Sequence, residues 1–201
     1  PDAKLRDRII PPLMEIGGEI AQRIMQTVNE KTVSRQNSLE IQPEKKHCRD
    51  MDSRPLHIQT FGPFRVFVND KEIAAASWRT LKARDLLAYL IHQNQPVSAD
   101  QIMEDLWPDF NLQKASAGFH TNLYYLRRTL NRFAEKDLII YGGNQYQFRQ
   151  ESACIERRRF EELARPALRE PLTDPVVNRL EEAAALYRGD YLAELDYFWI
   201  I

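Results

Sequence analysis

The chain has 201 residues, a length that allows one or two small domains. Its formal net charge is −1 at pH 7, and 43% of its residues are hydrophobic. Its two cysteines, Cys48 and Cys154, lie far apart, which excludes a disulfide scaffold and fits a reducing cytoplasmic compartment. No apolar run approaches the roughly 20 residues of a membrane span, and no signal peptide is visible. We expect a cytoplasmic protein without membrane contact, and a fragment of a longer chain.

Residues 1–55 are predicted to form an upstream helix and a polar linker. Apolar residues recur there at three- and four-residue steps, as in an amphipathic helix: Leu13, Ile16, Ile20, Ile24 and Val28. The adjacent His47 and Cys48 could be half of a metal site, but no partner ligands have zinc-like spacing. We therefore predict no metal and no cofactor.

A small antiparallel sheet is predicted to follow. Leu56–Phe61 and Phe64–Val68 are rich in strand-forming residues and are separated by Gly62-Pro63. Asn69-Asp70 is a turn signal before a short Glu72-Ile73 segment.

Two helices with clear start and stop signals are predicted after this sheet. Thr80 is suited to cap a helix that runs to about Gln93. Ser98 and Gln101 have the spacing of a capping box, which opens a short helix that Pro108 stops.

The next helix, predicted over about 113–134, is amphipathic and basic. Its apolar stripe has helical spacing: Phe119, Leu123, Leu126, Leu130 and Phe133. From Asn111 to Ala134 there are four Lys and Arg residues and no acidic residue. Such a face suits a groove lined by phosphates, but an ordinary surface helix with solvated charges has the same pattern.

A β-hairpin is predicted from Leu138–Tyr141 and Gln145–Phe148, joined by Gly142-Gly143-Asn144. Sheet, three helices and hairpin are the elements of an α+β winged helix-turn-helix over 56–149. In that fold the third helix enters the major groove, and the hairpin, here 141–145, is the wing, which contacts the minor groove or the DNA backbone.

Residues 150–201 read as helical. Phe160 and Leu163 lie on a helical pattern that Pro166 interrupts. A second helix begins with Asp174 as its cap and Pro175 in its first turn, and Gly189 follows its end; Leu180, Ala184 and Tyr187 are its expected apolar face. Two such helices are one unit of a helical repeat, so they must dock on the preceding domain or continue past Ile201.

Several motifs, in this order, resemble the SARP-type bacterial transcriptional activators, which use an OmpR/PhoB-type winged helix. They are Phe61-Gly62-Pro63-Phe64, Trp78-Arg79 with Lys82-Ala83-Arg84, Pro96-Val97-Ser98, Leu106-Trp107-Pro108-Asp109, and Leu123 with Leu126-Arg127-Arg128. Behind them, the Leu180 to Leu192 segment and Tyr197-x-Trp199 resemble the start of the TPR-like bacterial transcriptional activation domain. Tyr124 and Tyr125 depart from the family pattern.

The resemblance implies a sequence-specific activator that binds double-stranded DNA and contacts RNA polymerase. By analogy and by helix position, the base-facing residues are Lys114, Ala117, Thr121, Tyr124 and Arg128. The expected phosphate contacts are Trp78, Arg79, Thr80, Lys82, Tyr125, Arg127 and Arg132, and the expected wing contacts are Gly143, Asn144 and Gln145. We expect dimerisation through the helical-repeat part or through missing regions.

Structural roles compete with some of these assignments. Trp78 equally fits a core position, and Arg127 equally fits a packed stem paired with an acid. His120, at the edge of the stripe, is expected to be structural. The run Arg157–Arg159 usually marks a solvated face, although it could extend the DNA footprint.

Two other functions remain as alternatives. An enzyme is not expected, because the chain has neither a Gly-x-x-x-x-Gly-Lys nor a Gly-x-Gly-x-x-Gly loop and no nucleophile at a useful spacing from its four histidines. A winged helix could instead be a protein–protein docking module of a larger signalling ATPase, since a fold does not determine a function.

Overall fold

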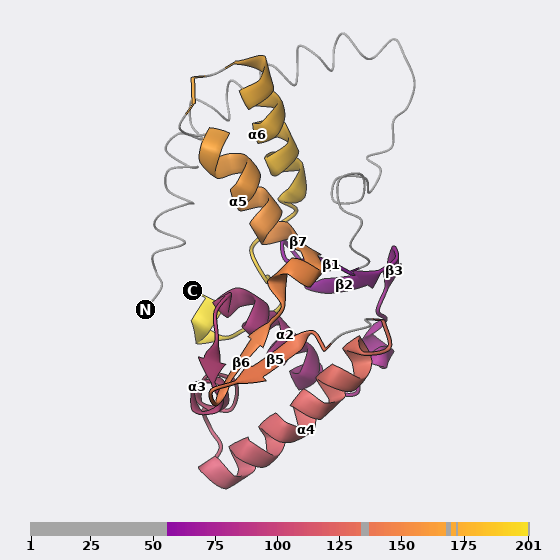
Figure 1. Cartoon of the computed structure of the whole chain (residues 1–201), viewed down its shortest axis with the longest axis vertical. Coiled ribbons are helices and arrows are strands. Elements are labelled where there is room, and N and C mark those ends of the chain that lie inside the picture. Colours follow the sequence, from indigo (N-terminus) through magenta and orange to yellow (C-terminus); the bar gives the residue numbers. More distant parts are fainter. Residues whose placement is uncertain (1–55, 134–136, 168–169, 172, 201) are drawn as a thin grey trace.

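The computed structural model describes residues 56–133, 137–167, 170–171 and 173–200. The upstream helix, the linker and the His47-Cys48 pair expected within residues 1–55 lie outside this part. The described residues form five α-helices and two small sheets, so the predicted α+β class is confirmed. The α5–α6 pair and helix α4 lie at opposite ends of the molecule (Figure 1).

The first sheet has the strand order β3-β2-β1-β7. Strands β1 (Leu56–Gln59), β2 (Arg65–Val68) and β3 (Lys71–Glu72) are antiparallel, as predicted. Asn69 and Asp70 both have positive φ, 45° and 67°, as a tight β2–β3 turn requires. Strand β7 (Ala153–Ile155) adds parallel to β1, which the sequence did not predict.

Helices α2 and α3 begin at the predicted caps. The Thr80 hydroxyl accepts the Ala83 N–H at 3.1 Å ahead of α2 (Leu81–Gln93), and the Ser98 hydroxyl accepts the Gln101 N–H at 3.1 Å ahead of α3 (Ala99–Leu106). The return half of the capping box is replaced, because the Gln101 amide donates to Asp105 instead. Helix α2 is buried over most of its length and forms the centre of the core.

Helix α4 (Leu112–Leu130) is shorter than predicted at its C-terminus. The Asn111 side chain caps it by accepting the Lys114 N–H at 3.0 Å. Four members of the predicted stripe are buried (Phe119, Leu123, Leu126 and Leu130). Phe133 lies beyond the helix and is 43% exposed, so its predicted core position is wrong.

The predicted hairpin forms strands β5 (Ile139–Gly142) and β6 (Gln145–Phe148). Its turn places Gly143 and Asn144 at φ 59° and 61°, the left-handed region that favours glycine and asparagine. A third strand, β4 (Val97–Ser98), pairs with β6 and ties the hairpin to the α2–α3 connection.

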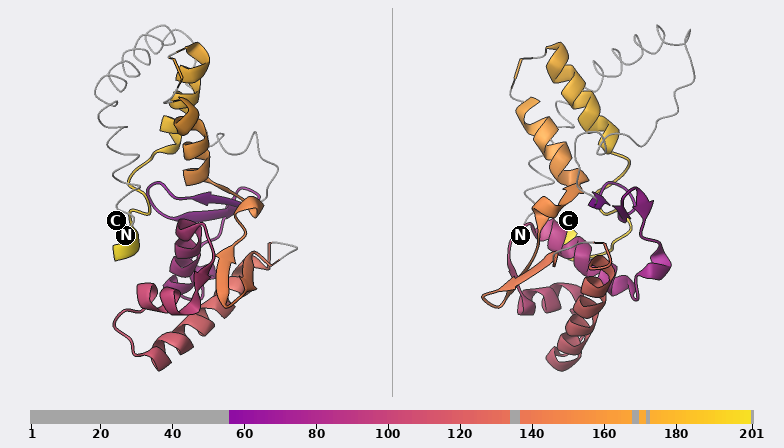
Figure 2. Two further views of the ribbon diagram at one scale, coloured as in Figure 1. Left: turned by 60° about the vertical axis from the view of Figure 1, so that its left-hand side comes forward. Right: turned by 45° about the vertical axis from the view of Figure 1, so that its right-hand side comes forward.

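Helices α5 (Glu156–Ala167) and α6 (Asp174–Leu186) pack side by side (Figures 1 and 2). Pro166 lies inside α5 rather than ending it. Helix α6 buries Val176, Leu180, Ala183 and Leu186, whereas Ala184 and Tyr187, expected on its apolar face, are exposed. Asp174 is its first residue and Thr173 holds the cap position. The chain then returns to the core, where Leu192 and Trp199 are buried.

Candidate nucleic-acid interface

Helix α4 presents all five predicted base-facing residues on its exposed side. Lys114, Ala117, Thr121, Tyr124 and Arg128 are exposed, and Tyr124 leaves 57% of its surface open. Their spacing of 3, 4, 3 and 4 places them on one face, opposite the buried stripe. The structure therefore brings this predicted set together on one exposed surface, which we call the α4 face.

The α4 face is cationic and free of carboxylates. From Asn111 to Phe133 the chain carries neither Asp nor Glu. Of the four Lys and Arg residues in this stretch, Lys114 and Arg128 lie on the α4 face and Arg132 is exposed just beyond the helix, whereas Arg127 is paired with Asp137. A surface of this composition attracts polyanions, and its hydroxyl, aromatic and methyl groups offer different contacts to base edges.

His120 also lies on the exposed side of α4, with its ring 5.1 Å from that of Phe119. It follows Ala117 by three residues and precedes Tyr124 by four, so helical spacing alone could have assigned it to the α4 face. Its contact with the Phe119 ring is compatible with the structural role expected for it.

Close packing sets the angle between α4 and α3. A Cβ atom at Gly118 would lie 3.2 Å from Nε1 of Trp107, so the helix backbone approaches the indole closely. Trp107 is the C-cap of α3, and its backbone N–H donates to the Met103 carbonyl at 2.9 Å. The close approach at Gly118 therefore joins the end of α3 to the first half of α4.

A second joint connects α4 with the start of α2. The buried Asn122 amide donates to the Gly118 carbonyl at 2.7 Å, and its oxygen accepts the Thr80 hydroxyl. Thr80 thus caps α2 and orients Asn122 at the same time. Its hydroxyl is engaged within the protein rather than directed at a phosphate.

The other predicted phosphate contacts divide into two groups. Trp78 is only 6% exposed and belongs to the core. The Arg127 guanidinium lies 3.3 Å from the Asp137 carboxylate and donates to the Ile139 carbonyl at 3.0 Å, which matches the packed-stem alternative. Arg79 and Arg132 are exposed, and Tyr125 is half-buried against the core.

Lys82 is likewise engaged inside the protein. Its ammonium donates to the Leu106 carbonyl at 2.6 Å and to the Tyr197 hydroxyl at 2.9 Å. Burial lowers the pKa of Lys82, and the charges of Asp85 and Asp109 oppose that shift.

The hairpin extends from the body of the molecule (Figure 2, right), and Gly143, Asn144 and Gln145 at its tip are exposed. Tyr141 beside them is 56% exposed and packs its ring 4.7 Å from that of Tyr146. Sequence reasoning placed Tyr141 in the hairpin but missed it as an exposed aromatic group near the tip.

No described helix combines the length and the apolar character needed to cross a bilayer. Among the described residues there is also no group of three or more His, Cys, Asp or Glu side chains placed to hold a metal ion.

No protein-family model and no curated protein matches the chain. Among solved structures, the chain is similar to Mycobacterium tuberculosis EmbR, whose structure was determined in complex with a low-affinity phosphopeptide, with a TM-score of 0.58 and 22% identity. The match covers 73% of this chain and 40% of the EmbR chain, so this chain spans less than half of that protein. At this identity the likeness concerns the fold alone.

Proposed function

We propose that the chain binds double-stranded DNA in a sequence-specific manner, as the winged-helix part of a bacterial transcriptional activator. The observation that carries this proposal is the α4 face, a basic, acid-free and exposed helix surface opposite a stripe that anchors the helix in the core. The likeness of the fold to that of EmbR, and the motifs that resemble those of the SARP-type activators, support the same assignment.

The dimensions and chemistry of α4 suit the major groove. Its 19 residues span about 28 Å at 1.5 Å per residue, and the groove of about 12 Å admits one helix. In this arrangement Lys114 and Arg128 meet acceptor atoms of guanine or phosphate oxygens. Thr121 and Tyr124 offer hydroxyl groups, and the Ala117 methyl allows close contact with a thymine methyl.

Phosphate contacts are proposed for the residues whose side chains the fold leaves accessible. These are Arg79, Tyr125 and Arg132. The wing residues Gly143, Asn144 and Gln145 are proposed to contact the minor groove or the DNA backbone. Trp78, Thr80, Lys82 and Arg127 are omitted, because each is buried or bonded to another part of the protein.

A paired charge reversal tests the α4 face. Duplexes selected from a random pool provide the ligand, and fluorescence anisotropy provides the dissociation constant. We expect Lys114→Glu/Arg128→Glu to weaken binding by at least about 2 kcal/mol, since two favourable contacts become repulsive. Lys71→Glu/Arg165→Glu, which changes the net charge equally at exposed positions on β3 and α5, is the control. Equal affinity of the two variants would contradict the proposal.

Salt dependence separates DNA binding from the docking-module alternative. Displacement of counterions makes the logarithm of a DNA affinity fall linearly with the logarithm of salt concentration, by about 0.9 per phosphate neutralised. We expect the affinity for duplex DNA to fall steeply with salt in the wild type and less steeply in Lys114→Glu/Arg128→Glu. An association with a protein partner that salt leaves unchanged, without duplex binding, would favour the docking module.

The remaining parts of the proposal follow from the resemblance. RNA polymerase is the proposed protein partner of the activator, and dimerisation is proposed through the helical pair α5–α6 or through parts outside the described residues. We propose a binding role for this chain rather than a catalytic one.

A further inference from the structure

The segment Asp190–Ile200, here called the strap, connects the helical pair to the core below it. It begins beside the residues that follow β1, where the Gly62 N–H donates to the Asp190 carbonyl at 2.9 Å and the Leu192 N–H donates to the Thr60 carbonyl at 2.8 Å. Leu192 is 1% exposed, so the strap is anchored by burial as well as by backbone hydrogen bonds.

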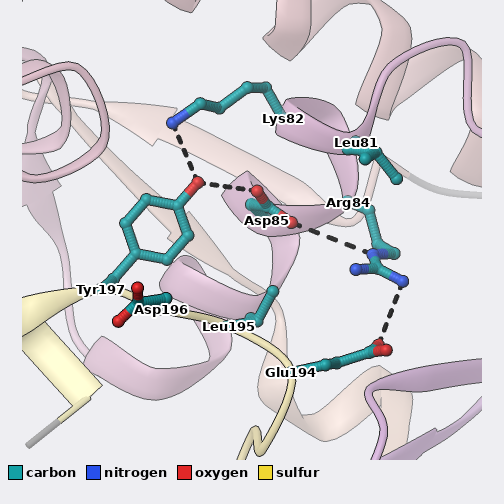
Figure 3. A pocket seen from close by; sticks show the side chains of 8 residues that line it. All are labelled: Leu81, Lys82, Arg84, Asp85, Glu194, Leu195, Asp196 and Tyr197. Carbon is teal, nitrogen blue, oxygen red and sulfur yellow. Dashed lines mark hydrogen bonds and ion pairs between the residues drawn. The ribbon is translucent and has the colours of Figure 1, made fainter.

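The far end of the strap lies on the first two turns of α2 (Figure 3). The Tyr197 hydroxyl donates to the Asp85 carboxylate at 2.7 Å and accepts from the Lys82 ammonium at 2.9 Å. Arg84 and Glu194 form an ion pair at 3.1 Å in the same place. These side chains line an open pocket of about 340 Å³.

Lys82 continues this contact to the end of α3. Its ammonium holds the Leu106 carbonyl at 2.6 Å and lies 5.6 Å from the centre of the Trp107 ring. Trp107 is the residue against which the backbone of Gly118 in α4 packs. Direct contacts therefore run from Tyr197 through Lys82 and the end of α3 to the proposed recognition helix.

We propose that Tyr197 is a positioning residue, which acts through Lys82 to hold α3 and α4 at the angle that base recognition needs. This inference rests on the proposed DNA binding. Discrimination between sequences requires side chains held to within about 0.5 Å, whereas attraction to phosphates tolerates larger shifts. Without the Tyr197 hydroxyl, the Lys82 ammonium loses one of its two hydrogen-bond partners, and only its position 4.8 Å from the Tyr197 ring centre still connects the end of α3 to the strap.

Tyr197→Phe tests the proposal in the full chain, because it removes the hydroxyl and keeps the ring that stacks on Trp199 at 5.4 Å. Anisotropy titrations compare a selected duplex with a scrambled one. We expect the affinity ratio to fall about threefold to tenfold, at an unchanged salt slope and unchanged affinity for scrambled DNA. This is less than the full value of a hydrogen bond to a charged group, because the hydroxyl acts on α4 only through Lys82 and the end of α3. A general loss of folded protein would weaken both duplexes equally.

Tyr187→Phe is the matched control. The Tyr187 hydroxyl also donates to a carboxylate, that of Asp190, but this hydrogen bond is exposed to solvent. We expect no change in this variant. Lys82→Met should reproduce the loss, and Lys82→Met/Tyr197→Phe should be no worse than either single variant. Additive losses, or a salt slope that falls in Lys82→Met, would overturn the proposal, because Lys82 would then contact phosphate directly.

Hydrogen exchange without DNA makes the two proposals distinguishable. We expect faster exchange over residues 103–118 in Tyr197→Phe than in the wild type or in Tyr187→Phe. Unchanged exchange and unchanged discrimination would overturn the role of Tyr197 and leave DNA binding intact. A wild-type chain that binds no duplex would contradict the proposed function, whatever the exchange of this segment.

Discussion

Glu156 is the most deeply buried carboxylate at the junction between the first sheet and the helical pair. It is 1% exposed and accepts the N–H groups of Thr60 at 3.0 Å and Phe61 at 3.3 Å. Its other oxygen accepts a hydrogen bond from Arg188, just beyond α6, and lies 3.8 Å from Nε2 of His57. One side chain thus joins the end of β1, the start of α5 and the exit of α6.

We predict that Glu156 makes the stability of the chain pH-dependent. Burial raises the pKa of Glu156 above its ordinary 4.5, against the opposing hydrogen bonds from Arg188 and the two backbone N–H groups. A raised pKa in the folded state means tighter proton binding there. This contribution is therefore complete below pH 4.5 and is lost as the pH rises through the folded-state pKa. Each tenfold difference in proton affinity between the folded and unfolded chains corresponds to about 1.4 kcal/mol of stability.

Glu156→Gln removes this titration. Urea unfolding from pH 4 upward gives the free energy of unfolding of both chains. The excess of the wild type over Glu156→Gln should be largest at pH 4 and should shrink as the pH rises. Asp85, whose pKa burial also raises, remains in both chains and cancels in the difference. An excess in the free energy of unfolding that grows with pH would contradict the raised pKa of Glu156.

Individual site residues were predictable only where their role depends on local spacing. Helical periodicity placed the α4 face correctly on the exposed side, because exposure along one helix follows from the stripe on its other side. Lys82 was misjudged, because its partner Tyr197 is 115 positions away in the chain. Thr80 and Asn122 are separated by 42 positions, and no local pattern predicts that pair.

At the scale of elements, the approach of α4 to α3 depends on the absence of a side chain at Gly118. Glycine weakens an interior helical position by about 1 kcal/mol relative to alanine, so the close contact with Trp107 must compensate for that cost. Trp107 is 6% exposed and cannot move away freely.

We predict that Gly118→Val destabilises the chain by about 2–3 kcal/mol, since the added groups overpack against the indole. Ala117→Val is the control, because it places the same side chain one position away on the exposed face and should cost about 0.5–1 kcal/mol. Urea unfolding monitored by circular dichroism measures both. No loss, or a small gain, in Gly118→Val would contradict the prediction, because helix propensity alone favours valine over glycine.

Local signals predicted most elements and missed the pairings that close the sheets. Caps and prolines located α2 and α3, and Gly143-Asn144 located the hairpin turn. Strands β4 and β7 have two and three residues, too short for a periodic pattern, and each exists through a distant partner. The apolar face of α6 was misjudged because three adjacent alanines leave its register open until α5 packs against it.

At the scale of the whole molecule, one hydrophobic core includes residues from both ends of the described chain. Leu192 and Trp199 belong to the same buried cluster as α2, α4 and both sheets. The helical pair has its own smaller cluster, which includes Phe61 from the turn after β1. The strap therefore contributes to the core of the proposed DNA-binding part, and the helical pair is attached to it on both sides.

We predict that Trp199 stabilises this assembly as one cooperative unit. Its ring meets that of Tyr89 edge-to-face at 5.1 Å and lies 5.2 Å from the ring of His92, so it contacts two side chains of α2. Trp199→Ala should reduce the free energy of unfolding by about 3–5 kcal/mol, because truncation of a buried Trp leaves a cavity.

Calorimetry with far-ultraviolet circular dichroism tests this prediction. Trp199→Phe is the control, because it keeps an aromatic contact with Tyr89 and should lower the free energy of unfolding by less. The wild type and both variants should unfold in single transitions, at temperatures that fall from the wild type to Phe to Ala. If Trp199→Ala instead showed two transitions, with the helical pair melting at the wild-type temperature, the strap would not join the two parts into one folding unit.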